Sequence, residues 1–192
     1  PLGIGQIRRP TGTSGQYFDG IIDELMILDT AVIPEPAEEE VIEPILYWNL
    51  NETSGTSAAD SSGNGNDGST NAAWDNSYSR ACLTFDGSSD YISLYNTYLS
   101  QSLSGDFTVA FWTRFDRAGS DDRLIDVAQS SSDGFQIAVD PDGGVRIDNE
   151  GGVSSAIHST TTGMTGSWHH VAAVRTGSTV EIHKRKNSFP SG

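Results

Sequence analysis

The clearest pattern along the chain is an alternation of side chains in FTVAFWTRF, residues 107–115. Phe107, Val109, Phe111 and Thr113 fall on one face of an extended strand, because side chains alternate across a strand. Similar runs follow in RLIDVAQ, GFQIAVD, GVRIDN, SWHHVAAVR and TVEIHK, separated by turn sequences such as DPDGG and RTGS. No long helical pattern occurs. The pattern predicts an all-β protein, a two-sheet antiparallel β-sandwich whose inner faces form the core.

An earlier apolar run, GIIDELMILD at residues 20–29, lacks this alternation. It fits either one face of a helix or a strand buried on both sides, and periodicity alone does not decide between them. The turn sequence FDG precedes it and β-branched residues are frequent, so we predict a strand. Residues 33–44, IPEPAEEEVIEP, then carry three prolines and a run of glutamates, which is typical of a solvated linker.

Composition narrows the class of protein. Hydrophobic residues make up 35% of the 192 residues and glycine occurs 21 times, as in chains of many short strands joined by turns. The formal net charge of −15 repels a phosphate backbone, so we expect no nucleic-acid partner. No apolar stretch approaches the ~20 residues of a membrane helix, so we expect no membrane insertion. The single cysteine, Cys82, rules out an internal disulfide framework, and we expect it to be buried and inert.

Several motifs occur in order along residues 46–183: LYWNLNETSG, AADSSGNGNDG, ACLTFDGSSDYISL, GDFTVAFWTRF and GSWHHVAAVRTGSTVEIHK. In this combination the chain resembles the laminin-G-like, concanavalin A-like jelly-roll family. It looks closest to the type found in repeats of large bacterial secreted and surface proteins. The resemblance implies a jelly-roll sandwich in a secreted or cell-surface protein.

Domains of this family end with IG, a polar loop, FDG-x-IDE and an apolar run, and this ending is missing after Lys184. Residues 4–32 match that ending but stand at the front. We therefore divide the chain into closing strands at 4–32, an acidic, proline-rich linker at 33–44 and a main body at 45–192, all within a single domain.

Three arrangements explain this order: a circularly permuted sandwich, a cut across two tandem repeats, or tails exchanged between chains in a dimer. We favour completion within one chain, because an unpaired strand of this kind would aggregate. A monomer and a strand-swapped dimer both stay open.

The resemblance also implies a structural Ca²⁺ ion between the DSSGNGNDG loop, residues 60–68, and the acidic residue of the last strand. Ca²⁺ takes six to eight oxygen ligands, which carboxylates, amides and glycine-rich backbone supply. A carboxylate among isoleucines and leucines is costly to bury alone, and a cation would relieve that cost. The loop is also compatible with an ordinary solvated turn. The candidate ligands are Asp23, Asp60, Asn64, Asn66 and Asp67.

Four aromatic residues lie in loop-like stretches rich in Asn, Asp and Ser, which supply the apolar platform and hydrogen bonds of a glycan site. They are Trp74, Tyr78, Tyr95 and Tyr98. Aromatic plugs over the edge of the core are the alternative. Trp48 and Trp112 lie in strong strands, and we place them in the core.

Nothing in the sequence points to catalysis. The E-x-D-x-x-E pattern of jelly-roll glucanases is absent, no nucleophile elbow occurs, and His169 and His170 project to opposite faces of their strand. We expect a non-catalytic, calcium-containing binding or adhesion module of a larger extracellular protein, with loops that bind a glycan or a surface protein. The alternatives are a structural spacer repeat and, less favoured, a fragment of a jelly-roll polysaccharide-degrading enzyme.

Overall fold

The structure is a computed structural model, and it describes residues 2–4, 17–31, 43–78, 80–94, 105–116, 122–130, 133–149, 157–158 and 164–186. No helix occurs among these residues, and none of them forms a span that could cross a membrane as a helix. The strands are β1 (Leu2–Ile4), β2 (Asp19–Leu28), β3 (Leu46–Trp48), β4 (Ser57–Ala58), β5 (Gly68–Thr70), β6 (Ala73–Asp75), β7 (Cys82–Asp86), β8 (Ile92–Leu94), β9 (Phe107–Phe115), β10 (Asp122–Ser130), β11 (Asp133–Val139), β12 (Val145–Asn149), β13 (Ile157–His158), β14 (His169–Thr176) and β15 (Thr179–Lys186).

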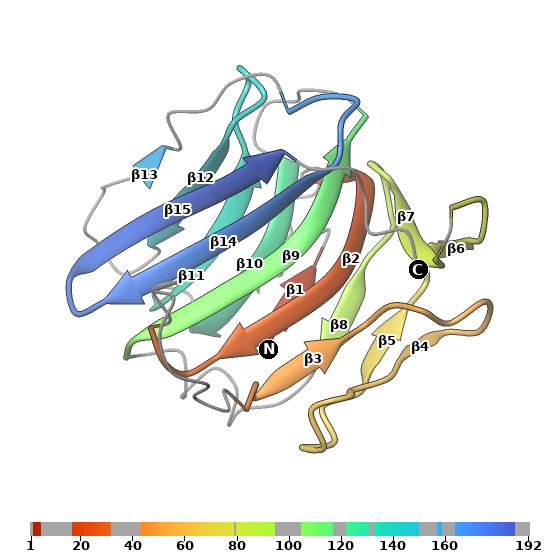
Figure 1. Ribbon diagram of the computed structural model, residues 1–192, viewed down its shortest axis with the longest axis horizontal. Helices are drawn as coiled ribbons and strands as arrows, with labels where there is room; N and C mark the ends of the chain where they lie inside the picture. Colours follow the sequence, from red (N-terminus) through yellow and green to blue (C-terminus); the bar gives the residue numbers. More distant parts are fainter. Residues whose placement is uncertain are drawn as a thin grey trace.

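Two sheets lie face to face around one core (Figure 1). The eight-stranded sheet has the order β13-β12-β11-β10-β1-β8-β5-β4, and the seven-stranded sheet has the order β15-β14-β9-β2-β7-β6, with β3 also paired to β2. The paired strands within each sheet are antiparallel. In Figure 1 the seven-stranded sheet is in front, with its outer face toward the viewer. The predicted two-sheet antiparallel β-sandwich is confirmed.

The alternation in β9 sets which face of the sheet is apolar. Phe107, Val109, Phe111 and Phe115 project inward and are buried in the core. At about 25 cal/mol per Å² of apolar surface, each such side chain contributes roughly 2–3 kcal/mol of burial free energy. The intervening side chains project outward, so the strand that holds the core together also builds the outer face.

The N-terminal apolar run forms β2, a central strand of the seven-stranded sheet (Figure 1). It pairs with β9 along one side, and along the other with β7 over residues 19–22 and with β3 over residues 25–27. The ladder with β9 shifts by one residue between Asp23 and Met26, and this β-bulge interrupts the period-two alternation of β2. All these partners belong to the same chain. Permutation and a cut across repeats both stay predictions, and most of the predicted linker lies outside the described residues.

The two FDG sequences of the chain lie side by side. Residues 18–20 run antiparallel to residues 85–87, with Asp19 opposite Asp86 and the Gly87 N–H donating to the Phe18 carbonyl at 3.0 Å. The Phe18 ring is fully buried, 5.8 Å from the Phe85 ring. A Cβ on Gly20 would stand 2.3 Å from the Arg114 carbonyl oxygen, so only glycine fits there. The motif therefore anchors β2 between β7 and β9.

Candidate functional site

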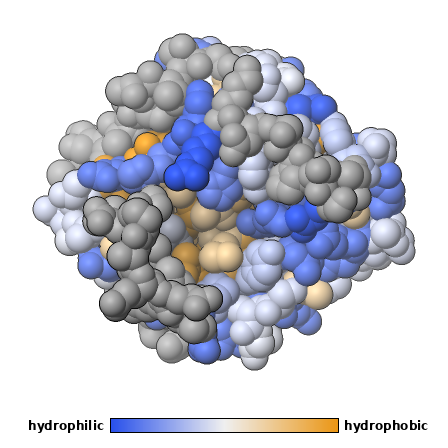
Figure 2. Space-filling model, in the orientation of Figure 1, coloured by the Kyte–Doolittle hydropathy of each residue, from blue (hydrophilic) through white to orange (hydrophobic). Residues whose placement is uncertain are grey.

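One row of side chains crosses the middle of the outer face of the seven-stranded sheet. Residues paired across antiparallel strands project to the same side, so the ladder register defines the row. It contains Ala172 on β14, Ala110 on β9 and Met26 on β2, with His183 and Tyr47 at its two ends. We call these five residues the central row. Figure 2 shows apolar side chains at the centre of this face, set back between hydrophilic ones.

Trp112 borders the central row. It lies two residues from Ala110 on β9, and its ring meets the His170 ring edge-on at a centroid distance of 5.3 Å. Burial lowers the pKa of His170, so the imidazole is neutral at pH 7. Trp112 is partly exposed, and our placement of it in the core is wrong, whereas Trp48 is fully buried as predicted. In the alternating pattern Trp112 falls on the other face of the strand from Phe111, and this pattern could have identified Trp112 as an outer-face residue.

A second aromatic cluster lies farther along the same face. The Arg114 guanidinium stands 5.7 Å from the centroid of the Tyr78 ring and hydrogen-bonds to its hydroxyl group. Trp168 packs edge-on against Tyr78 at 5.6 Å. Arg114 also pairs with Asp116, at 3.0 Å between Nη2 and Oδ1. Both aromatic rings are partly exposed, so this cluster extends the polar and aromatic surface beyond Trp112.

Two of the four predicted glycan-stacking residues, Trp74 and Tyr78, lie among the described residues, and their contacts differ. Tyr78 belongs to the cluster with Trp168. Trp74 packs against the core, and its Nε1 donates to the Gly55 carbonyl at 2.9 Å. Tyr95 and Tyr98 lie outside the described residues. The predicted binding by these four side chains stays a prediction.

The predicted calcium loop is organised around the Asp60 carboxylate. Its Oδ1 accepts from the backbone N–H groups of Tyr47 and Ser62 at 3.0 Å each, and its Oδ2 accepts from the Asn66 N–H at 2.9 Å and the Ser62 hydroxyl at 2.8 Å. Burial opposes ionisation, but these donors hold the pKa of Asp60 below its usual value. In this arrangement both oxygens face hydrogen-bond donors, which suits a loop organiser better than a cation ligand.

The rest of this loop is tied to the strand entering the sheet. The amide nitrogen of Asn66 donates to the Ile45 carbonyl at 2.7 Å, and the Asn66 carbonyl accepts from Trp48 Nε1 at 2.9 Å. The amide nitrogen of Asn64 donates to the Pro44 carbonyl at 3.2 Å, and Asp67 Oδ1 accepts from the Asp60 N–H at 2.8 Å. Among the described residues, no group of three or more His, Cys, Asp or Glu is arranged to hold a metal.

Asp23 occupies a different setting, beside Trp112 in the ladder between β2 and β9. Its side chain is 0% exposed, and neither carboxylate oxygen has a hydrogen-bond partner among the described residues. Burial raises the pKa of Asp23 to about 7, against the lowering effects of the nearby Arg80 charge and of the Glu24 backbone N–H. The two aspartates therefore differ: Asp60 is a hydrogen-bonded loop residue with a lowered pKa, whereas Asp23 is a buried strand residue with a raised pKa.

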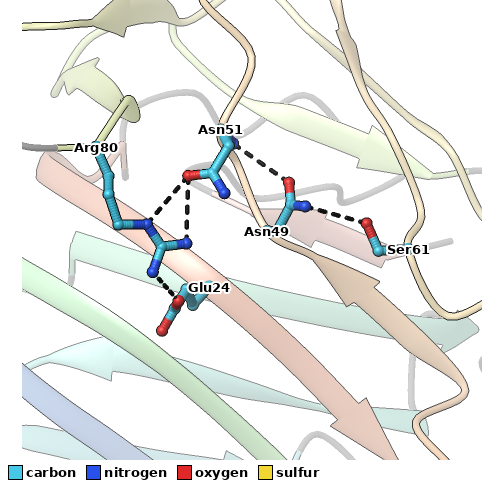
Figure 3. A network of polar contacts seen from close by, with 5 residues as sticks. All are labelled: Glu24, Asn49, Asn51, Ser61 and Arg80. Carbon is cyan, nitrogen blue, oxygen red and sulfur yellow. Dashed lines mark hydrogen bonds and ion pairs between the residues drawn. The ribbon is translucent and has the colours of Figure 1, made fainter. Parts of the chain in front are cut away.

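A polar network covers the strand next to Asp23 (Figure 3). Arg80 forms an ion pair with Glu24 and donates to the Asn51 side-chain oxygen at 3.2 and 3.3 Å. The network continues from the Asn51 N–H to Asn49 at 3.3 Å, and from Asn49 to the Ser61 hydroxyl at 3.2 Å. It links β2 to the segment after β3 and to the loop that begins at Asp60.

The comparison with protein families agrees with this architecture. The family model described as the concanavalin A-like lectin/glucanases superfamily, of laminin-G type, matches residues 85–183, just over half of the chain. The chain belongs to this superfamily. Searches among curated proteins and among solved structures returned no match.

The matched segment of this concanavalin A-like domain runs from the end of β7 into β15. It contains Trp112, His170 and Trp168, and so includes much of the outer face described above. Asp23 and Asp60 lie outside the matched segment, so their roles are argued from the contacts alone.

Proposed function

We propose that this chain is a non-catalytic carbohydrate-binding module of a larger extracellular protein, and that it binds its glycan on the outer face of the seven-stranded sheet. The observation that carries the proposal is the partly exposed Trp112 beside the central row. The superfamily includes lectins by its description, which supports a module of this class. The sequence pointed to loops, and the sheet face replaces them as our candidate surface.

The central row suits the apolar face of a sugar ring. Ala110 and Ala172 have short side chains, so a flat ring can approach the sheet closely there, and the Trp112 ring offers a wall with a π surface. His183 and Tyr47 at the ends of the row carry groups that hydrogen-bond to hydroxyls. A few placed polar groups around an apolar floor are typical of small-molecule sites.

Two polar side chains lie close together at one end of the row. His183 Nε2 is 3.3 Å from the Glu181 carboxylate, within ion-pair distance but without hydrogen-bond geometry. Both side chains are well exposed, and we assign this pair an orienting role with little effect on stability. We propose binding without catalysis, because retaining glycoside hydrolysis needs two carboxyl groups about 5 Å apart across the substrate, and nothing in the central row supplies them.

Titration of the isotopically labelled protein with a panel of oligosaccharides tests the proposal. We expect chemical-shift changes centred on Ala110, Ala172 and Trp112, and at least a tenfold loss of affinity in Trp112→Ala. Ala172→Phe, which fills the central row, should abolish binding with an unchanged fold. Tyr78→Ala is the matched control: a greater loss there than in Trp112→Ala would return the site to the loops. Silence across a broad glycan array would favour the structural spacer.

The remaining parts of the proposal concern context. We propose secretion or surface display, an adhesive role toward glycans or surface proteins, and a monomer in solution, with the strand-swapped dimer as the alternative that light scattering would reveal. Turnover of a polysaccharide would instead indicate the enzyme fragment. We also propose one bound calcium ion, although the hydrogen bonds of Asp60 argue against the ligand set expected from the sequence.

A further inference from the structure

Two residues other than glycine have a positive φ in the described part of the chain, and one polar network connects them. They are Glu24 on β2, with φ of 49°, and Leu50 in the segment after β3, with φ of 51°. This left-handed conformation is unfavourable for residues that carry a Cβ. The network runs from Glu24 through Arg80 to Asn51 and Asn49, which flank Leu50 (Figure 3). Strained backbone positions of this kind cluster at functional sites.

Glu24 occupies a β-bulge position where glycine is usual. Between Asp23 and Met26 the ladder with β9 shifts by one residue, so Glu24 and Leu25 together oppose Phe111. In the bulge type whose first residue is left-handed, that residue is normally glycine. Leu25 is fully buried in the core, whereas the Glu24 side chain is 23% exposed. The chain therefore keeps an outward-facing carboxylate here at a cost in backbone strain.

The bulge places this carboxylate within the proposed glycan surface. Asp23, the residue before Glu24, is the ladder neighbour of Trp112, and Met26, two residues after it, belongs to the central row. The Glu24 charge also reaches one end of that row, since burial and, after it, this charge raise the pKa of Tyr47. Along β2, Glu24 thus lies between the ladder position of Trp112 and that of the central row.

The Arg80 guanidinium binds one oxygen of the Glu24 carboxylate. Arg80 Nη1 donates to Glu24 Oε1, while Nε and Nη2 donate to the Asn51 side-chain oxygen at 3.3 and 3.2 Å. In Figure 3 the second oxygen of Glu24 points away from the guanidinium. Both side chains of the pair are about one-fifth exposed, so a ligand can reach them. A partly exposed ion pair adds little to folding stability, so stability alone does not explain the strained glutamate.

We propose that Glu24 and Arg80 bind two neighbouring hydroxyl groups of an uncharged sugar ring that packs on Trp112. One hydroxyl donates to the Glu24 carboxylate and the next accepts from an Arg80 N–H, and both hydrogen bonds are charge-assisted. The pair carries no net charge, and the chain as a whole carries −15, so the surface disfavours an anionic sugar. This contact rests on the proposed glycan binding and adds the chemistry of the ring that is bound.

Calorimetric titration of the full chain with cellopentaose, xylopentaose and mannopentaose tests this contact, with a pentamer of galacturonate as the charged probe. We expect at least one neutral oligosaccharide to bind at least tenfold more tightly than the galacturonate. Glu24→Gln and Arg80→Gln should each weaken that binding at least tenfold. Asp116→Asn removes the carboxylate from the Arg114 ion pair farther along the same face, so it is the matched control and should bind as the parent chain does.

Glu24→Gly separates ligand binding from a structural role. Glycine adopts φ of 49° without strain, so this variant should keep the melting temperature of the parent chain but lose affinity as Glu24→Gln does. A melting temperature that falls together with the affinity in both Glu24 variants would assign the pair a structural role and overturn the inference. Tighter binding of the galacturonate than of the neutral oligosaccharides would also overturn it.

The same variants distinguish this contact from the glycan surface as a whole. Parent affinity in Glu24→Gln, with affinity lost in Trp112→Ala, would overturn the role of the ion pair and leave glycan binding on the sheet face standing. A parent chain that binds none of these oligosaccharides and nothing on a broad glycan array would remove the proposed function, and this contact with it.

Discussion

Replacing Asp23 by asparagine in metal-free protein isolates the cost of its buried carboxylate. The pKa of Asp23 is raised from 3.8 to about 7 because burial penalises the charged form. The folded chain therefore binds more protons than the unfolded chain between these values, and the free energy of unfolding falls as pH rises through this window. A shift of about three units corresponds to roughly 4 kcal/mol in total.

Only part of that total is visible in an accessible pH range. Between pH 5 and pH 8 this one group should lower the free energy of unfolding by roughly 2–3 kcal/mol. Asp23→Asn lacks the titrating group and should lose this component of the slope. At pH 8 the variant should be the more stable of the two by about 1–3 kcal/mol, less than the full shift because the buried amide also lacks partners.

Urea denaturation in chelator, followed by tryptophan fluorescence at pH 5, 6, 7 and 8, measures these differences. The variant keeps His170, whose lowered pKa makes stability rise with pH, so subtracting the two curves leaves Asp23 alone. A parent curve in chelator that is flat relative to the variant would refute the argument that Asp23 is an unpaired buried carboxylate.

Three further predictions concern the scaffold. Gly20→Ala should lower the free energy of unfolding by at least about 3 kcal/mol, because its Cβ would stand 2.3 Å from a β9 carbonyl oxygen, whereas Gly105→Ala, with open space around it, should change thermal melting little. Cys82 should react with a thiol reagent only at the rate of global unfolding, since the thiol is fully buried; rapid labelling of native protein would contradict this. Asp86→Asn should flatten the curve of unfolding free energy against pH below pH 4. Hydrogen bonds from Ser88 and its neighbours lower the pKa of Asp86 in the folded chain, so the stabilisation by this carboxylate is present above pH 4 and is lost on acidification. Solvent screening keeps this stabilisation near 1 kcal/mol or less.

The sandwich could be predicted because apolar and polar residues alternate along its amphipathic strands. In residues 107–115 alternation separates Phe111 from Trp112, and that division is what the structure shows. The run that forms β2 was ambiguous, since the register shift between Asp23 and Met26 interrupts its alternation and a buried helix segment has a similar pattern. Turn chemistry and β-branched residues decided for a strand, and the ladder with β9 confirms it.

The candidate site was harder to predict for a physical reason. In a sequence, an aspartate that accepts four hydrogen bonds, such as Asp60, and a deeply buried one, such as Asp23, have the same letter. Asp60 lies in a glycine-rich loop of the kind that binds calcium, so the sequence suggested it as a ligand. In the structure its carboxylate accepts hydrogen bonds from nearby N–H and hydroxyl groups. Asp23 stands in an apolar run, and its burial beside Trp112 becomes visible only in the ladder between β2 and β9.

On one edge of β2 the partner changes from β7 to β3, and Asp23 lies where it changes. This strand precedes all of its partners in the chain, and the hydrogen bond from Thr113 Oγ1 to the Ile21 carbonyl spans 92 residues. Such non-local pairing forms slowly, because loop closure is paid before contacts are gained. The half of β2 near Gly20 is anchored by the paired FDG sequences, and the half near Ile27 by β3. Asp23 lies between these halves and beside Trp112 in the ladder, so the uncharged form of its buried carboxyl group stabilises both the closing strand and the wall of the proposed glycan surface.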